Sequence, residues 1–471
     1  MKYNQQKISE ISANTANIIL VCLLSVAAIL IMYNANWTLG DDDQFIRTTV
    51  VGQPIMGWCS KGRFWPLGLF DCSILLFVPF GHTITMHMAY CCTTMIISVI
   101  LMFNLLKKVT NHDYIASIIP IVILFFSSSF MRIHMLCTFA ERFMFTLFSL
   151  IMLCIWMAER SKKTKYYICA FIASVYVTYM KEPTFGALLI IILTKLIFSK
   201  EQMNKKDKIF YILLAINSLT YFFIYLYVRT KTFPTLIGVD SILYQLQNEE
   251  PLLWGVIILG IVRGFKLVFQ MGGGNHRENN LLLDAFLFAG IGYMCAIFIL
   301  GLASDYYTFP TLVLSLPSFA HYLHKIRINK NVALLSAFTA VFLTPCIIRS
   351  ANKEYRNIKY ILKCRSNDMA AIEYVVNQCK QGKNIVFVMP KNNSTEQWCS
   401  TLPENAIKTV FGFQDIIYKR QTDFSGINEN SIVILPSWQI NKTDQLNNVS
   451  VMNDFYLYFK DAFIGIYVPK K

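Results

Sequence analysis

The sequence predicts a mainly α-helical protein: a polytopic bundle of about eleven transmembrane helices, followed by a small C-terminal α/β soluble domain. Of its 471 residues, 55% are hydrophobic and only 15% are charged, and the mean hydropathy is +0.45. Soluble domains usually have about a quarter of their residues charged. Apolar runs recur through residues 1–349, whereas residues 350–471 have the mixed composition of a soluble domain. We therefore expect a membrane domain at 1–349 and an α/β domain at 350–471.

The chain is strongly basic, with a net charge of +15 and a pI near 9.1. No soluble segment interleaves basic and aromatic residues, as nucleic-acid-binding surfaces do, so nucleic acid is excluded as a partner. In a membrane protein, basic residues collect in cytoplasmic loops and face anionic lipid headgroups. Membrane lipid is thus the expected partner of this charge.

The first apolar run follows a short N-terminus that carries Lys2 and Lys7, and no small-residue cleavage site comes after it. This pattern favours a retained membrane helix over a signal peptide. A membrane helix needs about 20 largely apolar residues, with roughly 17 as the lower limit. The expected spans lie near residues 17–33, 84–105, 113–130, 143–158, 166–180, 184–199, 209–228, 252–270, 281–300, 306–323 and 331–348.

The loops between these runs indicate the orientation. Counted from a cytoplasmic N-terminus, the inner loops hold the basic clusters that the positive-inside rule expects. They are Lys107-Lys108, Arg160 to Lys165, Lys200 to Lys208, Arg277, and Lys325 to Lys330. An odd number of spans then places the C-terminal domain on the periplasmic or extracellular side.

The C-terminal segment shows both helical and strand patterns. Ser366-Asn367-Asp368 is a candidate cap for a helix in which Met369, Ile372, Val376 and Cys379 recur at helical spacing. Residues 384–389, 432–435 and 463–467 are short apolar runs typical of buried strands. No glycine-rich phosphate loop marks the domain as a nucleotide site.

The first outer connection, from about Asn34 to His82, is far longer than the usual handful of residues. It opens with Asp41, Asp42 and Asp43. Adjacent carboxylates raise one another's pKa unless a cation is near. They are either a solvated cap at a helix end or a general base at the membrane surface. Three adjacent aspartates permit a divalent metal without requiring one.

Groups suited to a phosphate or a sugar follow in the same loop. An arginine at Arg47 or Arg63 can bind a phosphate or carboxylate through two hydrogen bonds. Trp58 and Trp65 are either interfacial anchors or a platform for the face of a sugar.

Acid–base residues also cluster at the other outer turns, where they could line one cavity open to the outer leaflet. Any single charge at a span end often only extends toward the interface. Arg263 is different because it lies within an apolar run, and a charge there is a functional candidate by default. The residues at the outer turns are Arg132 and His134, Glu141 and Arg142, Lys181 and Glu182, and Asp305 to Tyr307.

An acidic cluster directly after the first span resembles the GT-C glycosyltransferases, which use lipid-phosphate-linked sugars as donors. The stretch with Asp42-Asp43, Arg47, Gly52, Trp58 and Gly62-Arg63 is also similar to the start of the bacterial glucosyltransferases that decorate O antigen. The many spans and the outer C-terminal domain match the GT-C topology as well.

The resemblance implies a hexosyltransferase in the bacterial inner membrane. Its donor would be a polyprenyl-phosphate sugar, and its acceptor a lipid-linked glycan or a polysaccharide such as the O antigen of lipopolysaccharide. Asp42 or Asp43 would be the base, with Asp41 less favoured. By location and chemistry, Arg63, Lys181 and Arg142 would hold the phosphate, while Glu141 or Glu182 would orient the acceptor.

Two other functions remain open from the sequence. An O-antigen or capsule polymerase also acts on lipid-linked glycans, but it joins whole repeat units. A polysaccharide or lipid transporter often shows repeated halves and ionisable groups at mid-depth of the membrane. Here we find no internal repeat, and the ionisable groups cluster at the outer face, so the transferase is favoured.

Overall fold

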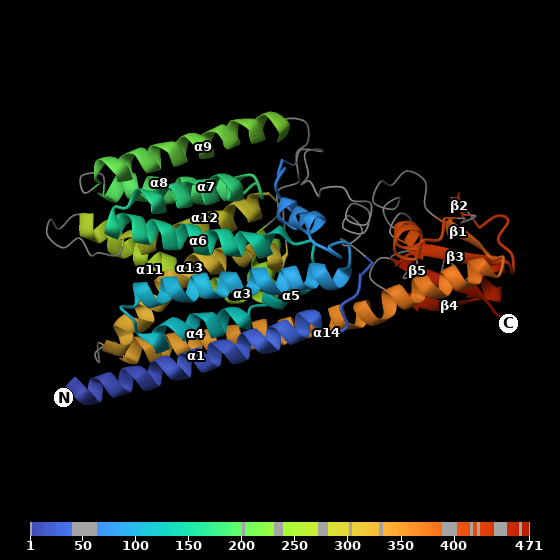
Figure 1. Ribbon diagram of the computed structural model, residues 1–471, viewed down its shortest axis with the longest axis horizontal. Coiled ribbons are helices and arrows are strands. Elements are labelled where there is room, and N and C mark those ends of the chain that lie inside the picture. Colours follow the sequence, from blue (N-terminus) through green and yellow to red (C-terminus); the bar gives the residue numbers. More distant parts are fainter. Residues whose placement is uncertain are drawn as a thin grey trace. The chain divides into compact units, whose positions relative to one another are not determined.

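The computed structural model is a bundle of helices followed by one small sheet (Figure 1). It describes residues 2–39, 64–199, 203–229, 239–271, 281–300, 304–328, 333–388, 403–414, 418–421, 424–437, 450–460 and 464–470. The chain divides into two compact units. The helical unit holds the described residues of 2–32, 64–72 and 88–358. The C-terminal unit holds those of 33–39, 73–87 and 359–470.

Most of the helices belong to the helical unit. They are α1 (Lys2–Met32), α3 (Ile84–Val109), α4 (Tyr114–Phe125), α5 (Phe130–Met135), α6 (Ala140–Ser161), α7 (Thr164–Thr178), α8 (Thr184–Ser199), α9 (Lys205–Arg229), α10 (Val239–Tyr244), α11 (Leu253–Met271), α12 (Leu281–Ile299), α13 (Asp305–Ile328) and α14 (Ala333–Lys380). A 3₁₀ helix, η1 (Phe70–Phe77), precedes α3, and a π-helical turn, η3 (Gln245–Glu249), precedes α11.

The expected apolar segments coincide largely with helices, although 113–130 extends past the end of α4, and the predicted count of eleven spans is not confirmed. Among the described residues, five helices are long and apolar enough to cross a membrane, or six if a pair bent by 111° forms one span. α4, α7 and α8 have only 12, 15 and 16 residues, fewer than a simple span needs. The five are Ile11–Met32, Ile84–Val109, Ala140–Ser161, Lys205–Val228 and Leu281–Ile299.

Local signals explain several of the tight connections between these helices. The Asp113 side chain accepts the amide of Ala116 at 3.2 Å and so caps the start of α4. Lys162 ends α6 with a left-handed backbone (φ 55°), and α7 begins two residues later at Thr164. Antiparallel neighbours with such short turns bring the charged ends of α6 and α7 together.

Helices α6 to α9, α12 and α13 pack side by side (Figure 1). α12 contacts both α8 and α13, and Gly290 lies at the close approach to α13. A Cβ atom at this position would lie 2.9 Å from the Thr311 carbonyl oxygen and 3.3 Å from the Leu314 Cβ. The absence of a side chain at Gly290 therefore allows α12 to approach the backbone of α13.

The C-terminal unit contains a five-stranded mixed sheet in the order β2-β1-β3-β5-β4. β1 pairs in parallel with β2 and β3, whereas β5 pairs antiparallel with β3 and β4. Its elements are β1 (Asn384–Val388), η5 (Ala406–Val410), β2 (Tyr418–Gln421), β3 (Ser431–Pro436), η6 (Ser450–Asp454), β4 (Phe455–Lys460) and β5 (Ile464–Pro469). One core cluster includes Val386, Val433 and Leu435 from the central strands.

The three predicted strands coincide with β1, β3 and β5, whereas β2 and β4 were not predicted. The predicted helix start at Ser366 to Asp368 is wrong, because α14 runs unbroken from Ala333 to Lys380. The Ser366 hydroxyl instead donates to the Leu362 carbonyl within the helix at 3.0 Å, and the Asp368 carboxylate accepts the amide of Leu39 at 2.9 Å. The expected domain boundary at 349/350 falls inside this helix.

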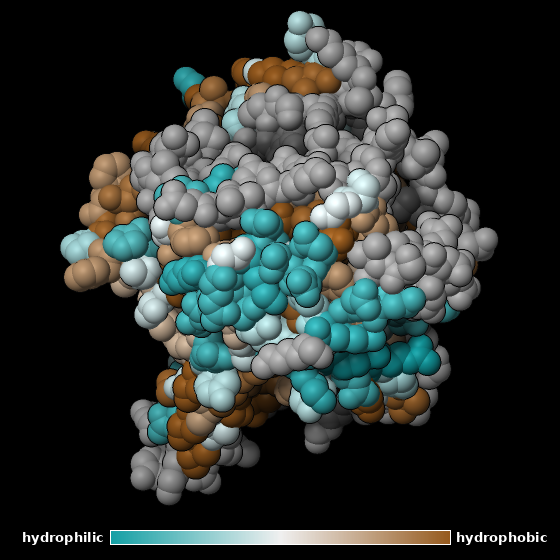
Figure 2. Space-filling model, turned by 90° about the vertical axis from the view of Figure 1, so that its right-hand side faces the viewer, coloured by the Kyte–Doolittle hydropathy of each residue, from teal (hydrophilic) through white to brown (hydrophobic). Residues whose placement is uncertain are grey.

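The surface has both hydrophilic and apolar regions. On the face shown in Figure 2, hydrophilic residues gather near the centre. Several helices of the helical unit instead expose large apolar side chains, such as Ile29 on α1, Phe223 on α9 and Phe269 on α11. Such helices suit a lipid environment.

Gly290→Ala should weaken the contact between α12 and α13. We expect it to lower the free energy of unfolding by about 1–3 kcal/mol relative to Gly264→Ala, because overpacking forces backbone shifts. Gly264 on α11 is the matched control, since a Cβ there meets no atom within 4 Å. Thermal unfolding of both purified variants in detergent measures the difference. Equal stabilities would show that α12 does not depend on this approach.

Candidate active site

Charged side chains from several helices meet at one end of the helical unit, where α6 and α13 begin and α7 ends. The turns that connect these helices are short, so their sequence-distant residues become neighbours. Glu141, Arg142, Lys181, Glu182 and Asp305 all lie here and all are buried. The structure thus brings together four of the predicted site residues, and Asp305, which the sequence placed at an outer turn, joins them.

Glu141 and Lys181 form the first pair in this cluster. The Lys181 Nζ lies 2.9 Å from the Glu141 Oε1, and both side chains are nearly inaccessible to solvent. The same ammonium lies over the rings of Trp65 and Tyr307, at 5.3 and 4.4 Å from their centroids. Two aromatic faces and one carboxylate therefore hold the lysine in place.

Arg142 forms the second pair, with Asp71 of η1. The guanidinium Nη2 donates to the Asp71 Oδ2 at 2.8 Å, and the Tyr90 hydroxyl donates to the same oxygen at 3.1 Å. Arg142 also contacts the sulfur atoms of Cys72 and Cys91. Burial raises the pKa of the Asp71 carboxyl, and the Arg142 charge and the Tyr90 hydrogen bond oppose that rise. Because Arg142 is fully buried in these contacts, its position suits a structural role.

The third group surrounds Asp305 at the start of α13. The Arg132 Nη1 lies 2.9 Å from one carboxylate oxygen, while the Lys353 Nζ lies 3.6 Å from the other. The Asn357 amide also donates to this second oxygen, at 3.3 Å. The Arg132 side chain keeps 32% exposure and Lys353 15%, so these two cations are more accessible than Arg142.

Two buried glutamates fix the loop between α4 and α5 beside this group. The Glu250 carboxylate accepts the Ser128 amide and hydroxyl, both at 3.0 Å, and the Ser350 hydroxyl at 2.9 Å. Glu354 accepts the amide of Met131. Burial raises the pKa of Glu250, which precedes α11, to about 7.

Arg263 lies elsewhere. It forms a bidentate salt bridge with Asp284, with both N–O distances 2.6 Å, and lies over the ring of Tyr322. Asp284 is in the first turn of α12, about 20 Å along the helix from Ile299 at the end near Asp305. The structure does not bring Arg263 together with the other predicted site residues.

A cavity of about 520 Å³ runs between α4, α11, α13 and α14. Its lining is almost wholly apolar and includes Leu124, Leu252, Leu316 and Phe319, with Tyr322 toward one end. Leu252 and Leu124 are close in sequence to Glu250 and Ser128. One end of the cavity therefore lies near the group around Asp305.

The proposed base and several binding residues lie outside the described residues. They are Asp41, Asp42, Asp43, Arg47, Trp58 and Arg63. The chain that follows them is fixed beside the Glu141–Lys181 pair, because the amide of Leu67 donates to the Tyr179 carbonyl at 3.0 Å. The Tyr221 hydroxyl also donates to the Phe64 carbonyl. In the described part of the chain, no group of three or more His, Cys, Asp or Glu residues could hold a metal ion.

Sequence reasoning missed Asp71, Glu250, Lys353, Glu354 and Asn357. A lone aspartate inside the apolar run Phe70–Phe77 was a usable signal, since an unpaired charge there needs a partner. The α14 residues were missed for another reason. They follow the last expected span, so they were assigned to the soluble domain.

Asp71→Asn should destabilise the helical unit by about 3–5 kcal/mol, because it leaves the Arg142 charge buried without its partner. The double variant Asp71→Leu with Arg142→Met should recover much of this loss, since no buried charge remains. Lys359→Gln, at an exposed position on α14, is the control and should cost below about 0.5 kcal/mol. Thermal unfolding measures all three, and a stable Asp71→Asn protein would contradict the structural role.

No protein-family model matches this chain, and no curated protein matches its sequence. Solved structures do match it. ArnT from Cupriavidus metallidurans bound to undecaprenyl phosphate aligns with a TM-score of 0.50 and 10% identity, over 97% of this chain and 98% of ArnT. The apo form of that protein gives 0.48, with 9% identity and the same coverage. An Archaeoglobus fulgidus oligosaccharyltransferase tethered to an acceptor peptide gives 0.38, with 10% identity over 96% of this chain and 74% of its own.

The ArnT match extends over nearly the full length of both chains, so it covers the helical unit and the C-terminal unit together. At 10% identity it bears on the fold alone. The match therefore shows that this chain has the fold of ArnT.

Proposed function

We propose that this protein transfers a sugar from a polyprenyl-phosphate donor to a cell-surface glycan at the outer face of the bacterial inner membrane. The observation that carries the proposal is the apolar cavity that ends near a cluster of accessible cations. A polyprenyl-phosphate sugar would match this arrangement, because it joins a long hydrocarbon chain to one phosphate and a polar sugar. The bound undecaprenyl phosphate of ArnT, whose fold the chain shares, supports this class of donor.

The hydrocarbon chain of the donor would occupy the cavity between α4, α11, α13 and α14. The apolar residues that line it can contact an isoprenoid chain without burying polar groups. The bidentate Arg263–Asp284 pair would then stabilise the helices near the far end of the cavity rather than contact the phosphate.

The phosphate would bind to Arg132 and Lys353, with Asn357 as a neutral donor. These side chains already converge on the Asp305 carboxylate, and Arg132 has a forked guanidinium suited to phosphate oxygens. They take the place of Arg142, which the sequence predicts as a phosphate ligand, because Asp71 and the surrounding thiols already contact that guanidinium. Lys181, and Arg63 from the first outer connection, are proposed as further phosphate ligands.

In the reaction, an acceptor hydroxyl attacks the anomeric carbon of the donor sugar. The bond between the anomeric carbon and the phosphate oxygen breaks, and the polyprenyl phosphate leaves with the electron pair of that bond. Asp42 or Asp43 takes the hydroxyl proton, and the cations stabilise the growing phosphate charge. Glu141 or Glu182 orients the acceptor, and Arg47 and Trp58 contact the sugar or its phosphate. Inversion in a single displacement needs only one base.

Asp42→Asn and Asp43→Asn test the base. The variant that removes it should lower turnover by at least about 100-fold with a polyprenyl-phosphate sugar donor, while the protein still inserts in the membrane. Asp454→Asn in the C-terminal unit is exposed and should keep full activity. Radiolabelled sugar transfer by purified enzyme measures this. Full activity in both loop variants would remove the aspartates from the mechanism.

Lys353→Gln tests the phosphate site. Loss of a charge-assisted hydrogen bond should lower kcat/KM for the donor by roughly 10- to 100-fold. Lys359→Gln, less than two turns farther along α14 and exposed, is the matched control and should behave as the wild type. Unchanged kinetics in Lys353→Gln would place the phosphate elsewhere.

We further propose that the acceptor is the O antigen of lipopolysaccharide. Gene deletion in the host, followed by a polysaccharide gel ladder and linkage analysis, tests this. A full ladder that lacks one branch sugar supports the decorating transferase. A collapse to single repeat units would instead indicate an O-antigen or capsule polymerase, and an unchanged polysaccharide would point to another acceptor or to transport.

A further inference from the structure

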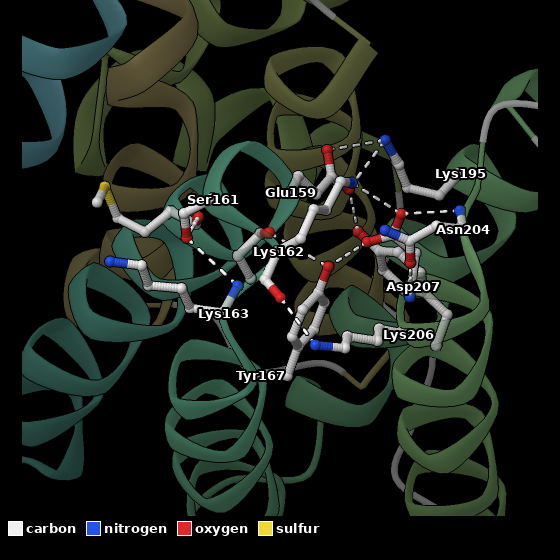
Figure 3. A network of polar contacts seen from close by, with 12 residues as sticks. Glu159, Ser161, Lys162, Lys163, Tyr167, Lys195, Asn204, Lys206 and Asp207 are labelled. Carbon is white, nitrogen blue, oxygen red and sulfur yellow. Dashed lines mark hydrogen bonds and ion pairs between the residues drawn. The ribbon is translucent and has the colours of Figure 1, made fainter.

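A rim of exposed lysines surrounds the opposite end of the helical unit, where α6 ends and α7 and α9 begin. The rim consists of Lys162, Lys163, Lys165, Lys205, Lys206 and Lys208. Figure 3 shows part of this region, in which Lys162, Lys163 and Lys206 lie around a network that joins the helix ends. None of these lysines belongs to the candidate active site.

The two carboxylates of this region, the part-exposed Glu159 and the buried Asp207, already have partners. Glu159 accepts the Lys195 Nζ and, at 2.7 Å, the Tyr211 hydroxyl. Asp207 accepts the Lys162 Nζ at 2.9 Å and the Tyr167 hydroxyl (Figure 3). Among the rim lysines, Lys162 forms an ion pair with a carboxylate of the described residues 159–165 and 203–210. The rim as a whole keeps a strong positive charge.

Exposed aliphatic side chains continue from the rim along two packed helices. On α7, Ile168 and Ile172 follow Lys165 at intervals of three and four residues, and they are 55% and 64% exposed. On α9, Ile209, Ile212 and Ile216 lie on the same face as Lys205 and are about half exposed. Residues at these spacings share one face of a helix. Each apolar stripe thus begins at an exposed lysine.

We propose that the rim and the two stripes bind an anionic phospholipid. Its phosphate would lie among Lys165, Lys205 and Lys208, and its acyl chains along the isoleucines of α7 and α9. The excess of ammonium groups favours an anion, and the stripes directly beside them favour a lipid over a soluble phosphate. The inference does not rest on the glycosyltransferase function, because it involves the other end of the helices.

Lipid binding to the purified full-length protein in detergent tests the proposal, with native mass spectrometry as the readout. The probes are phosphatidylglycerol, phosphatidylcholine and inorganic phosphate. We expect phosphatidylglycerol to bind tighter than phosphatidylcholine. The triple variant Lys165→Gln, Lys205→Gln and Lys208→Gln should weaken that binding about 100-fold, at roughly fivefold for each lysine.

The matched control removes three exposed lysines from α14, with Lys359→Gln, Lys363→Gln and Lys380→Gln. It changes the net charge equally and should keep wild-type binding. Equal losses in both triple variants would overturn the proposal, because they would reflect overall charge. Equal binding of phosphatidylcholine, or full competition by inorganic phosphate, would also overturn it. The rim side chains chosen are outside the buried network, so a melting curve without lipid should match that of the wild type.

Discussion

The Arg142 guanidinium is buried among helices, and the Asp71 carboxylate that neutralises it comes from a short 3₁₀ helix far away in sequence. A charge in this environment is tolerated only with a close partner of opposite sign. The same constraint recurs at Lys181 with Glu141 and at Arg263 with Asp284. These pairs select one arrangement of otherwise interchangeable apolar helices, since any other register would leave a charge unpaired.

The pairing also separates structural charges from those suited to a ligand. Arg142 and Arg263 are almost wholly inaccessible and have well-aligned carboxylate partners. Arg132 and Lys353 share one carboxylate and keep part of their surface exposed. An incoming phosphate can compete for Arg132 and Lys353 at a far lower desolvation cost than for Arg142 or Arg263. Accessibility, rather than charge alone, therefore distinguishes Arg132 and Lys353 from Arg142 and Arg263.

Much of the fold follows from local pattern. Apolar runs located the helices, and the runs at 384–389, 432–435 and 463–467 located three strands. Edge strands β2 and β4 were missed because their sequences, such as Tyr418–Gln421, lack the continuous apolar character of a buried strand. The count of eleven spans is not confirmed; among the expected spans, α4, α7 and α8 are apolar but short. Whether such a short apolar helix crosses the membrane depends on its length and on the helices that pack against it.

The candidate site was predicted less completely. Glu141, Arg142, Lys181 and Glu182 were found because charges at span ends are conspicuous, but their pairing depends on which helices pack together. Nothing local links Arg142 to Asp71 or Arg132 to Lys353. The unbroken α14 was also unexpected, since Ser366 to Asp368 offers a cap that the packed helix does not use.

The hydrogen bond from the Leu39 amide to Asp368 has a consequence for biosynthesis. The two residues are 329 positions apart, and both belong to the C-terminal unit. During translation, the segment that ends at Leu39 leaves the ribosome long before its partner exists. The chain directly before the acidic loop therefore acquires its anchor only when synthesis is nearly complete. A nascent or truncated protein without α14 would lack that anchor, so the protein would acquire its final form only late in its own production.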